Sequence, residues 1–301
     1  MSTAADAPAG AISGRHLVVA SVVLYRTPME LLRPCLQSLA RQHLSGDVRL
    51  ALAIMDNDGG SSLPGLDVLL EDLGLSGKVL VCLAGENVGF GRAHNALFKA
   101  CGSLMGNRAW LHLCVNPDSV YHHRAIGAMV DFASSRDFQG LFEARQFPRE
   151  HPKPYDEQDF RTPWCSGCAL MVPSAVYESL GGFSDDFFMY CEDVDLSWRA
   201  RLAGLDCYVV PAAIVHHDVT RKERDDAFER KHMLLSGFRL ARRFGNMAFA
   251  GAMADMLRQL LDPEEMRSLE RWGCGVEVLH DNTGGGVADF SQGFNFAKAR
   301  W

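Results

Sequence analysis

The sequence lacks any apolar run close to the ~20 residues that a membrane-spanning helix needs. Its first 15 residues are small and polar and include no hydrophobic stretch, so we expect a loose tail there rather than a signal peptide. Internal repeats and low-complexity tracts are also missing. Positive charge is not in excess: 30 basic and 37 acidic residues give a formal net charge of −7, which argues against nucleic acid as the main partner.

Paired cysteine motifs are scarce as well. The nine cysteines are an odd number, are scattered, and in several cases lie inside apolar runs, as Cys82, Cys114 and Cys207 do. This distribution indicates buried thiols in a reducing cytoplasm. Cys165-x-x-Cys168 has the spacing of a redox or zinc motif, but no second Cys or His pair lies nearby at ligand spacing. We therefore interpret these two cysteines as small strand residues.

What the chain does contain is a regular alternation of strand and helix patterns. The run 17–24 is continuously apolar, which predicts a strand buried on both faces. Thr27-Pro28-Met29-Glu30 then has the pattern of a helix start, with Thr27 as N-cap and Glu30 completing a capping box, while Pro34 is expected to kink this helix. Further strands are expected at 50–55, 79–83 and 110–115, and helices at 92–101 and 123–133.

This alternation predicts an α/β fold with a mostly parallel sheet flanked by helices on both faces. In such folds, sites lie at the carboxyl ends of the strands. Polar residues follow the predicted strands at these positions: Tyr25, Asp56, Asn57, Asn116 and Asp118.

The second half of the chain is less regular. Residues 146–163 are polar and proline-bearing, which predicts an excursion over the active face. Then we expect a strand at 164–172, a helix at 194–203, a strand at 207–210, and helices at 227–244 and 248–261 before an irregular end. The predicted parts are a tail at 1–15, a catalytic domain at 16–222 and a helical and irregular C-terminal appendage at 223–301.

Residues 87–95 form a glycine-containing turn that opens into a predicted helix. Gly89 and Gly91 would let a ligand approach the backbone, and a helix N-terminus attracts phosphate. A dinucleotide fingerprint needs a third glycine where this chain has His94, which makes a nicotinamide cofactor a weak interpretation. A tight turn without a ligand is the alternative.

Asp118 and the pair His216-His217 both follow apolar strands. Mg²⁺ and Mn²⁺ prefer oxygen ligands, often one or two carboxylates together with substrate phosphate, and histidine is a frequent metal ligand. Asp118 and one of the two histidines could therefore hold such an ion. Alternatively, Asp118 caps the next helix and the histidines are structural.

Three carboxylates fall within four residues, at Glu192, Asp193 and Asp195. Such crowding predicts a base, a cation site or a helix cap. An acidic helix start explains Asp195, which is spaced for an ion pair with Arg199, and leaves Asp193 for chemistry. Four aromatic residues precede the carboxylates, as a partly desolvated base requires: Phe183, Phe187, Phe188 and Tyr190. Upstream, Trp164 could stack on a sugar or nucleobase, or belong to the core.

Taken in order, these motifs resemble those of family-2 inverting glycosyltransferases with the GT-A fold. They are most similar to the rhamnosyltransferase-like branch that builds bacterial cell-surface polysaccharides. The resemblance covers residues 16–220 and rests on Ser21-Val22-Val23-Leu24-Tyr25, Asp56-Asn57, Asn87-x-Gly89-Phe90-Gly91-x-x-His94-Asn95, Asn116-Pro117-Asp118, Trp164-x-Ser166-Gly167, Gly182-Phe183 with Glu192-Asp193-x-Asp195-Leu196-x-x-Arg199, and His216.

The resemblance implies a nucleotide-sugar donor bound across the first half of a Rossmann-like sheet. Asp118 matches the last acidic residue of the family's Asp-x-Asp metal motif, whose first position is Asn116 here. His216 would be the second ligand of Mg²⁺ or Mn²⁺, with His217 as the alternative. The implied donor site comprises Tyr25 and Asp56 at the base and ribose, with Asn57, Asn87, Gly89, Gly91, His94, Asn95 and Asn116.

Asp193 matches the family's general base, and Trp164, Gly167 and Glu192 would contact the acceptor. The implied reaction is a single displacement that inverts the anomeric centre. The favoured donor is dTDP-L-rhamnose and the acceptor a saccharide or a lipid-linked saccharide, with UDP-galactofuranose and UDP-N-acetylglucosamine as alternative donors. A glycoside hydrolase, which needs opposed carboxylates about 5–9.5 Å apart, and a non-catalytic nucleotide-sugar-binding module are alternative functions.

We expect a cytoplasmic protein without nucleic acid as a partner. The segment 227–261 includes Arg239, Arg242 and Arg243 next to apolar residues, which is typical of a helix on the inner face of an anionic membrane. Packing of this helix on the catalytic domain, or on a second copy in a homodimer, is the alternative.

Overall fold

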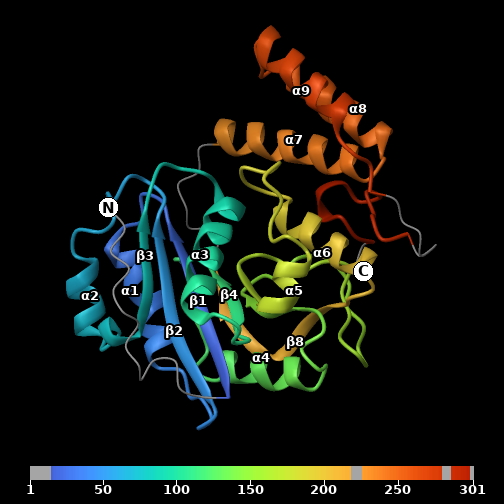
Figure 1. Cartoon of the computed structure of the whole chain (residues 1–301). Helices are drawn as coiled ribbons and strands as arrows, with labels where there is room; N and C mark the ends of the chain where they lie inside the picture. Colours follow the sequence, from blue (N-terminus) through green and yellow to red (C-terminus); the bar gives the residue numbers. More distant parts are fainter. Residues whose placement is uncertain (1–14, 218–225, 280–285, 299–301) are drawn as a thin grey trace.

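Across the residues that the computed structural model describes, 15–217, 226–279 and 286–298, eight strands form one sheet with the order β3-β2-β1-β4-β7-β6-β8-β5 (Figure 1). The predicted tail and the boundary near 222 lie outside the described residues. The strands are β1 (His16–Leu24), β2 (Val48–Asp56), β3 (Val79–Ala84), β4 (Leu111–Val115), β5 (Val120–Tyr121), β6 (Leu141–Phe147), β7 (Ala169–Pro173) and β8 (Cys207–His216).

Strands β3, β2, β1 and β4 run parallel to one another, as predicted. Strand β7 is antiparallel to both β4 and β6, and β5 is antiparallel to β8, so the second half of the sheet is mixed. The reversal has a simple cause: the segment before β7 crosses the carboxyl end of β4, so Ala169 begins β7 opposite Val115. Residues that follow β4 and residues that precede β7 therefore meet at one edge.

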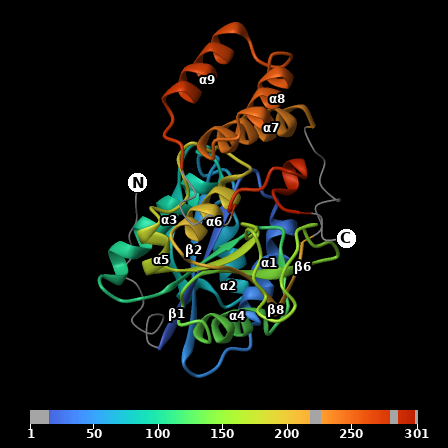
Figure 2. The ribbon, with the colours of Figure 1, turned by 90° about the vertical axis from the view of Figure 1, so that its right-hand side faces the viewer.

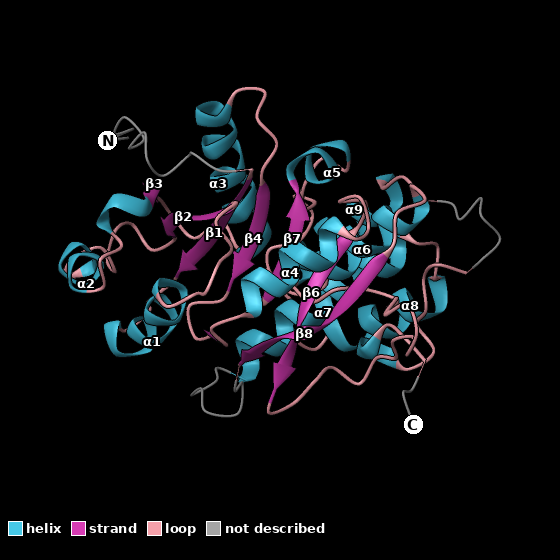
Figure 3. Ribbon diagram, turned by 90° about the horizontal axis from the view of Figure 1, so that it is seen from below, coloured by secondary structure: helices cyan, strands magenta, loops and turns pink. Residues whose placement is uncertain are grey.

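Helices cover both faces of the sheet, which confirms the predicted α/β class (Figure 3). Alternate β1 residues face opposite sides, with Val18 in one hydrophobic cluster and Val19 in another, because side chains alternate along a strand. On the Val18 side lie α1 (Met29–Ala40), α2 (Leu66–Asp72) and α4 (Ala125–Ser134). On the other side lie α3 (Phe90–Met105), α5 (Ser174–Ser179) and α6 (Glu192–Leu202).

The start of α1 differs from its prediction. Pro28 is the N-cap, and no side chain caps the helix. The Thr27 hydroxyl instead accepts a hydrogen bond from the Tyr25 N–H at 3.1 Å. The helix then continues through Pro34 to Ala40.

At the C-terminal end, α7 (Asp226–Arg243), α8 (Met247–Leu257) and α9 (Pro263–Gly275) lie together beyond one end of the sheet (Figures 1 and 2). The prediction of irregular chain after 261 was wrong, because α9 begins with a full capping box between Asp262 and Glu265. Residues 286–298 then return to α6, where Val287 and Phe296 share a hydrophobic cluster with Trp198. Of the helices in the described ranges, none is long and apolar enough to cross a membrane.

Candidate active site

A carboxylate and an imidazole meet beyond the end of β4. Asp118 Oδ1 lies 3.5 Å from His217 Nε2, and both side chains are buried. The other ring nitrogen, Nδ1 of His217, is 3.2 Å from Gln146 Oε1, and Asn116 Nδ2 is 3.3 Å from Nε2. If Nδ1 donates to Gln146, the Nε2 lone pair faces both the Asn116 amide and the Asp118 carboxylate, and Nε2 and Oδ1 could both act as ligands of a cation bound between them.

The histidine beside Asp118 is His217, whereas the sequence favoured His216. His216 is the last residue of β8 and pairs with Val120 and Phe147. Its ring lies 5.9 Å from the Phe147 ring, on the other side of the strand end. Because successive residues of a strand point to opposite faces, only one of the two histidines can face Asp118.

The Asp118–His217 pair fits a divalent cation. Adjacent ligands of an octahedral ion with bonds of about 2.1 Å lie about 3 Å apart, close to the observed 3.5 Å. Carboxylate and imidazole donors both suit Mn²⁺, and a carboxylate suits Mg²⁺.

Asp193 lies at the start of α6, where two residues in the left-handed backbone conformation, Tyr190 and Cys191, turn the chain into the helix. Its Oδ2 accepts a hydrogen bond from the Gly167 N–H at 2.9 Å and its Oδ1 accepts one from the Val194 N–H at 2.9 Å. Burial raises the pKa of Asp193, although these two N–H groups and the charge of Lys153 lower it in part. The residue as a whole is partly exposed. Such a carboxylate is both held in place and more basic than an ordinary aspartate.

The Asp118–His217 pair and Asp193 lie on either side of the same two residues, Gly167 and Cys168. Gly167 donates to Asp193, and the neighbouring Cys168 carbonyl accepts a hydrogen bond from the Asn116 N–H at 3.1 Å. Asp193 and the Asp118–His217 pair are therefore linked through neighbouring residues at the junction of β4 and β7.

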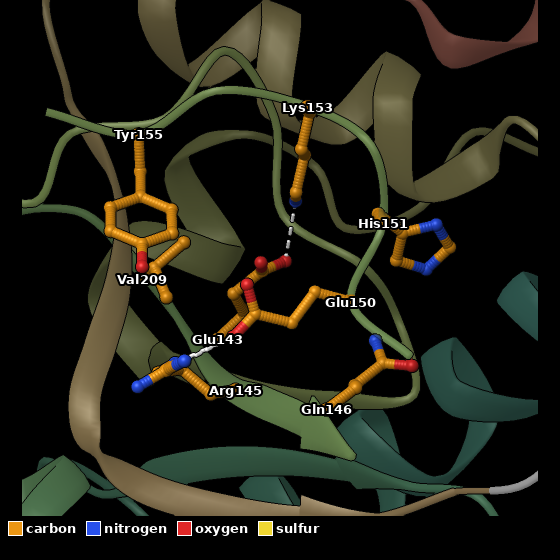
Figure 4. A pocket seen from close by; sticks show the side chains of 8 residues that line it. All are labelled: Glu143, Arg145, Gln146, Glu150, His151, Lys153, Tyr155 and Val209. Atoms are coloured by element: carbon orange, nitrogen blue, oxygen red, sulfur yellow. Dashed lines mark hydrogen bonds and ion pairs between the residues drawn. The ribbon is translucent and has the colours of Figure 1, made fainter. Parts of the chain in front are cut away.

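Beside this junction is a pocket that contains a buried ion pair (Figure 4). Lys153 Nζ lies 2.7 Å from Glu143 Oε2, also donates to the Trp164 carbonyl, and lies 3.9 Å from the centre of the Trp164 ring. Glu143 accepts a further hydrogen bond from the Ser166 N–H. Burial raises the pKa of Glu143, and Lys153 opposes this effect. The pocket is lined by Glu143, Arg145, Gln146, Glu150, His151, Lys153, Tyr155 and Val209.

The sequence did not reveal Glu143, Gln146 or Lys153 as site residues. Lys153 does lie in the predicted excursion 146–163, but its 3% exposure depends on a partner on β6 that no local pattern indicates. Strand β6 itself was missed because Leu141–Phe147 carries several polar side chains.

The polar residues at the ends of β1 and β2 belong to the predicted donor site. Tyr25 is 44% exposed, with the Arg26 guanidinium 5.2 Å from its ring centre. Asp56 is fully buried and accepts hydrogen bonds from the N–H groups of Asp58, Gly60 and Ser62. These contacts fold the loop after β2.

The turn at 87–89 is held from within the protein. Asn57 Nδ2 donates to Asn87 Oδ1 at 2.9 Å, and Asn57 Oδ1 accepts from the Val88 N–H at 3.1 Å. Gly89 has φ +88°, and a Cβ built there would meet the Phe188 carbonyl oxygen at 1.9 Å. A Cβ at Gly91 would meet Phe183 at 2.8 Å. Both positions thus require glycine because the loop before α6, at Phe183 and Phe188, packs directly against them. The sequence had instead suggested that these glycines make room for a ligand.

Two further residues of this predicted donor site face the interior. Asn95 accepts hydrogen bonds from Tyr177 Oη at 2.6 Å and from the Phe183 N–H at 3.0 Å. His94 is fully buried with its ring 5.6 Å from that of His112. His94 points toward the sheet because it lies on the inner side of α3, so it does not line the crevice.

The predicted acceptor residues are also largely internal. Trp164 is buried, with Lys153 over its ring and its indole N–H donating to the Asn295 carbonyl at 2.9 Å, so it offers no free face for stacking. Glu192 is buried as well, and burial, together with the charge of Asp193, raises its pKa to about 8. Gly167 has a direct role, since its N–H orients Asp193.

The predicted Asp195–Arg199 ion pair is confirmed, at 2.8 Å. Arg243 of α7 extends it: its Nε lies 2.8 Å from Asp195 Oδ1 and its Nη1 lies 2.7 Å from Asp186 Oδ2. Arg239 donates to the Asp186 carbonyl at 2.6 Å. Arg239 and Arg243, two basic residues of the predicted membrane helix, therefore bind Asp186 and Asp195 in and after the loop that precedes α6.

The fold is that of glycosyltransferases of known structure. Mannosyltransferase PcManGT from Pyrobaculum calidifontis, solved in complex with GDP-Man and Mn²⁺, superposes with a TM-score of 0.59 over 91% of this chain and 83% of its own, at 16% sequence identity. S. aureus TarS superposes with a TM-score of 0.52 over 85% of this chain and 52% of its own, at 13% identity. The predicted GT-A fold class is confirmed.

In sequence, the chain is similar to rhamnosyltransferases. It is 29% identical over an alignment of 187 residues to N-acetylglucosaminyl-diphospho-decaprenol L-rhamnosyltransferase of Mycobacterium tuberculosis, and this match covers 48% of this chain and 60% of that protein. It is 41% identical over 71 residues to rhamnosyltransferase WbbL of Escherichia coli, 22% of this chain and 27% of that protein. The matched stretches thus span less than two thirds of these relatives. No family model matches the sequence. The resemblance to rhamnosyltransferase-like glycosyltransferases that the motifs predicted is confirmed.

Proposed function

We propose that this chain is an inverting glycosyltransferase that transfers L-rhamnose from dTDP-L-rhamnose to a saccharide or lipid-linked acceptor. The observation that carries the proposal is the position of Asp193, partly exposed and held by two backbone N–H groups at the β4–β7 junction. The similarity to two rhamnosyltransferases supports the sugar, and the name of the mycobacterial relative supports a lipid-linked acceptor.

The reaction is a single displacement. The Asp193 carboxylate takes the proton of an acceptor hydroxyl while that oxygen forms a bond to the anomeric carbon. The bond between that carbon and the diphosphate oxygen breaks, and its electron pair leaves with the nucleoside diphosphate. Attack from the face opposite the leaving group inverts the anomeric centre.

The residues around Asp193 prepare it for this step. The hydrogen bonds from Gly167 and Val194 fix the carboxylate, and its desolvation makes it a better base near neutral pH. A divalent cation held by Asp118 and His217 would supply positive charge beside the departing diphosphate. In this proposal, Tyr25 and the loop after β2 would contact the donor base and ribose.

The test is incubation of the purified chain with dTDP-L-rhamnose, UDP-galactofuranose and UDP-N-acetylglucosamine, with Mn²⁺ and an acceptor, while nucleoside diphosphate release is measured. Release from the first donor supports the proposal, and release from a UDP-sugar alone would replace it with the alternative donor. Asp193→Asn should lower kcat by about 10²–10⁴-fold. Donor affinity measured by calorimetry should stay within a few-fold. Full turnover in that variant would remove Asp193 from the mechanism.

The cation ligands are tested by a matched pair of neighbours. We expect His217→Ala to weaken Mn²⁺ binding in calorimetry and His216→Ala to leave it unchanged. The reverse result would restore His216 as the ligand. Homodimer formation and contact with a membrane surface through 227–261 stay predictions, to be tested by light scattering and vesicle co-sedimentation.

A further inference from the structure

Three metal-ligating side chains meet in the interior, between α3 and β4. His94 lies on α3, while His112 and Cys114 lie two residues apart on β4 and so face the same side of the sheet. One ligand atom from each lies within 4.8 Å of those of the other two, and all three side chains are fully buried. The site is separate from the Asp118–His217 pair.

The hydrogen bonding of the two histidines is incomplete. Both ring nitrogens of His94 and Nε2 of His112 are buried without a hydrogen-bond partner. A buried polar atom without a hydrogen-bond partner destabilises the fold, so such atoms call for an explanation such as a bound ion. Burial lowers the pKa of both histidines, to about 3 for His112, so each ring is neutral and has a nitrogen lone pair to offer.

His112 is also oriented as a metal ligand would be. Its Nδ1 lies 3.3 Å from the Ser21 hydroxyl, which leaves Nε2 for coordination. Ligating histidines usually bond through their second nitrogen in this way, which fixes the ring and its tautomer.

We propose that His94, His112 and Cys114 bind a zinc ion that links α3 to β4. Two imidazoles and a thiolate match zinc and are poor ligands for Mg²⁺. Bonds of about 2.0–2.3 Å would bring the ligand atoms to about 3.5 Å from one another. Because all of them already lie within 4.8 Å of one another, each separation would shorten by at most about 1.3 Å.

The charge around the cluster suits a cation. Zinc with one thiolate and two neutral imidazoles carries a net positive charge. Burial raises the pKa of Cys114, and the negative charges of Asp193 and Glu192 raise it further, so the thiolate would form only as the cation binds. The Glu192 Oε2 is also buried without a hydrogen-bond partner. Ionised acidic side chains there would balance the charge of the bound ion, and the fourth coordination position would be filled by water.

The test is the zinc content of the purified full-length chain, measured by plasma mass spectrometry after reconstitution with Zn²⁺ under reducing conditions. We expect about one zinc per chain, as for a structural site. Cys114→Ser should lose this zinc, and its matched control Cys101→Ser, another fully buried cysteine on α3, should keep it. Asp118→Asn should also keep it.

A second measurement serves if Cys114→Ser does not fold. Wild-type protein loaded with Co²⁺ should show the near-ultraviolet absorption of a thiolate–cobalt bond, and a strong chelator should lower its melting temperature. Three results would overturn the proposal: no zinc after reconstitution, no thiolate–cobalt absorption, or zinc lost in Asp118→Asn but retained in Cys114→Ser. None of these readouts depends on transferase activity.

Discussion

Replacement of Arg243 by alanine should destabilise the protein strongly, although this residue lies in α7, far along the chain from the predicted catalytic motifs. Its guanidinium contacts two carboxylates at 2.7 and 2.8 Å, and one of them, Asp195, is fully buried. Removing one partner of a buried ion pair typically costs about 3–5 kcal/mol, because the other charge stays desolvated. Arg199 still pairs with the second oxygen of Asp195, so we expect the lower end, about 3 kcal/mol.

Urea denaturation followed by circular dichroism measures this loss. The control is Arg258→Ala, which removes contacts with Asp255 and Glu270 among side chains that are at least half exposed. Exposed ion pairs contribute about 0–1 kcal/mol, so the control should change little. In the double variant Arg243→Ala/Asp195→Asn, the loss should be smaller than the sum of the single losses. Equal losses in Arg243→Ala and Arg258→Ala would mean that the buried contacts of Arg243 stabilise the protein no more than an exposed ion pair does.

Three further outcomes are expected. The pKa of Asp193 is raised above the ordinary aspartate value of about 4, and the deprotonated carboxylate is the active form. The value of kcat/KM should therefore fall as the pH drops, and this fall should begin above the ordinary aspartate range. A pH profile that stays flat down to about pH 4 would contradict this. Lys153→Met removes a charge that lowers this pKa, so the fall should move to higher pH, as a rate–pH series on both proteins would show. Gly89→Ala should abolish soluble expression or lower the melting temperature sharply, because its Cβ would overlap the Phe188 carbonyl. Gly102→Ala within α3, which has open space around it, should fold normally.

Much of the sheet could be predicted from local pattern. Strand β1 was clear because an unbroken apolar run implies burial on both faces. Strand β6 was hidden, since its stability comes from pairing with β7 and β8 rather than from its own composition. Helix α9 was missed although Asp262, Pro263 and Glu265 form a complete start signal, because no long apolar stretch follows them.

The site was predictable where a residue's role follows from its place after a strand. Asp118 is an example, since the end of a strand defines its location. The choice between His216 and His217 depends on which side of the last strand each faces, and a one-residue difference reverses that side. Lys153 could not be found, because a buried lysine is recognised only by a partner distant in sequence.

Residues 183–189, in the loop before α6, are held by hydrogen bonds from several distant parts of the chain. Asn95 of α3 holds its start, Trp272 of α9 donates to the Asp186 carboxylate at 3.1 Å, and Ser236 of α7 donates to the Met189 carbonyl at 2.7 Å. A shortened protein ending near residue 222, the natural choice for isolating a catalytic module, would discard two of these three anchors. Chimeras that exchange the C-terminal third between transferases would therefore need to keep the residues that make these hydrogen bonds. Without them, the loop that precedes Asp193 would lose its support.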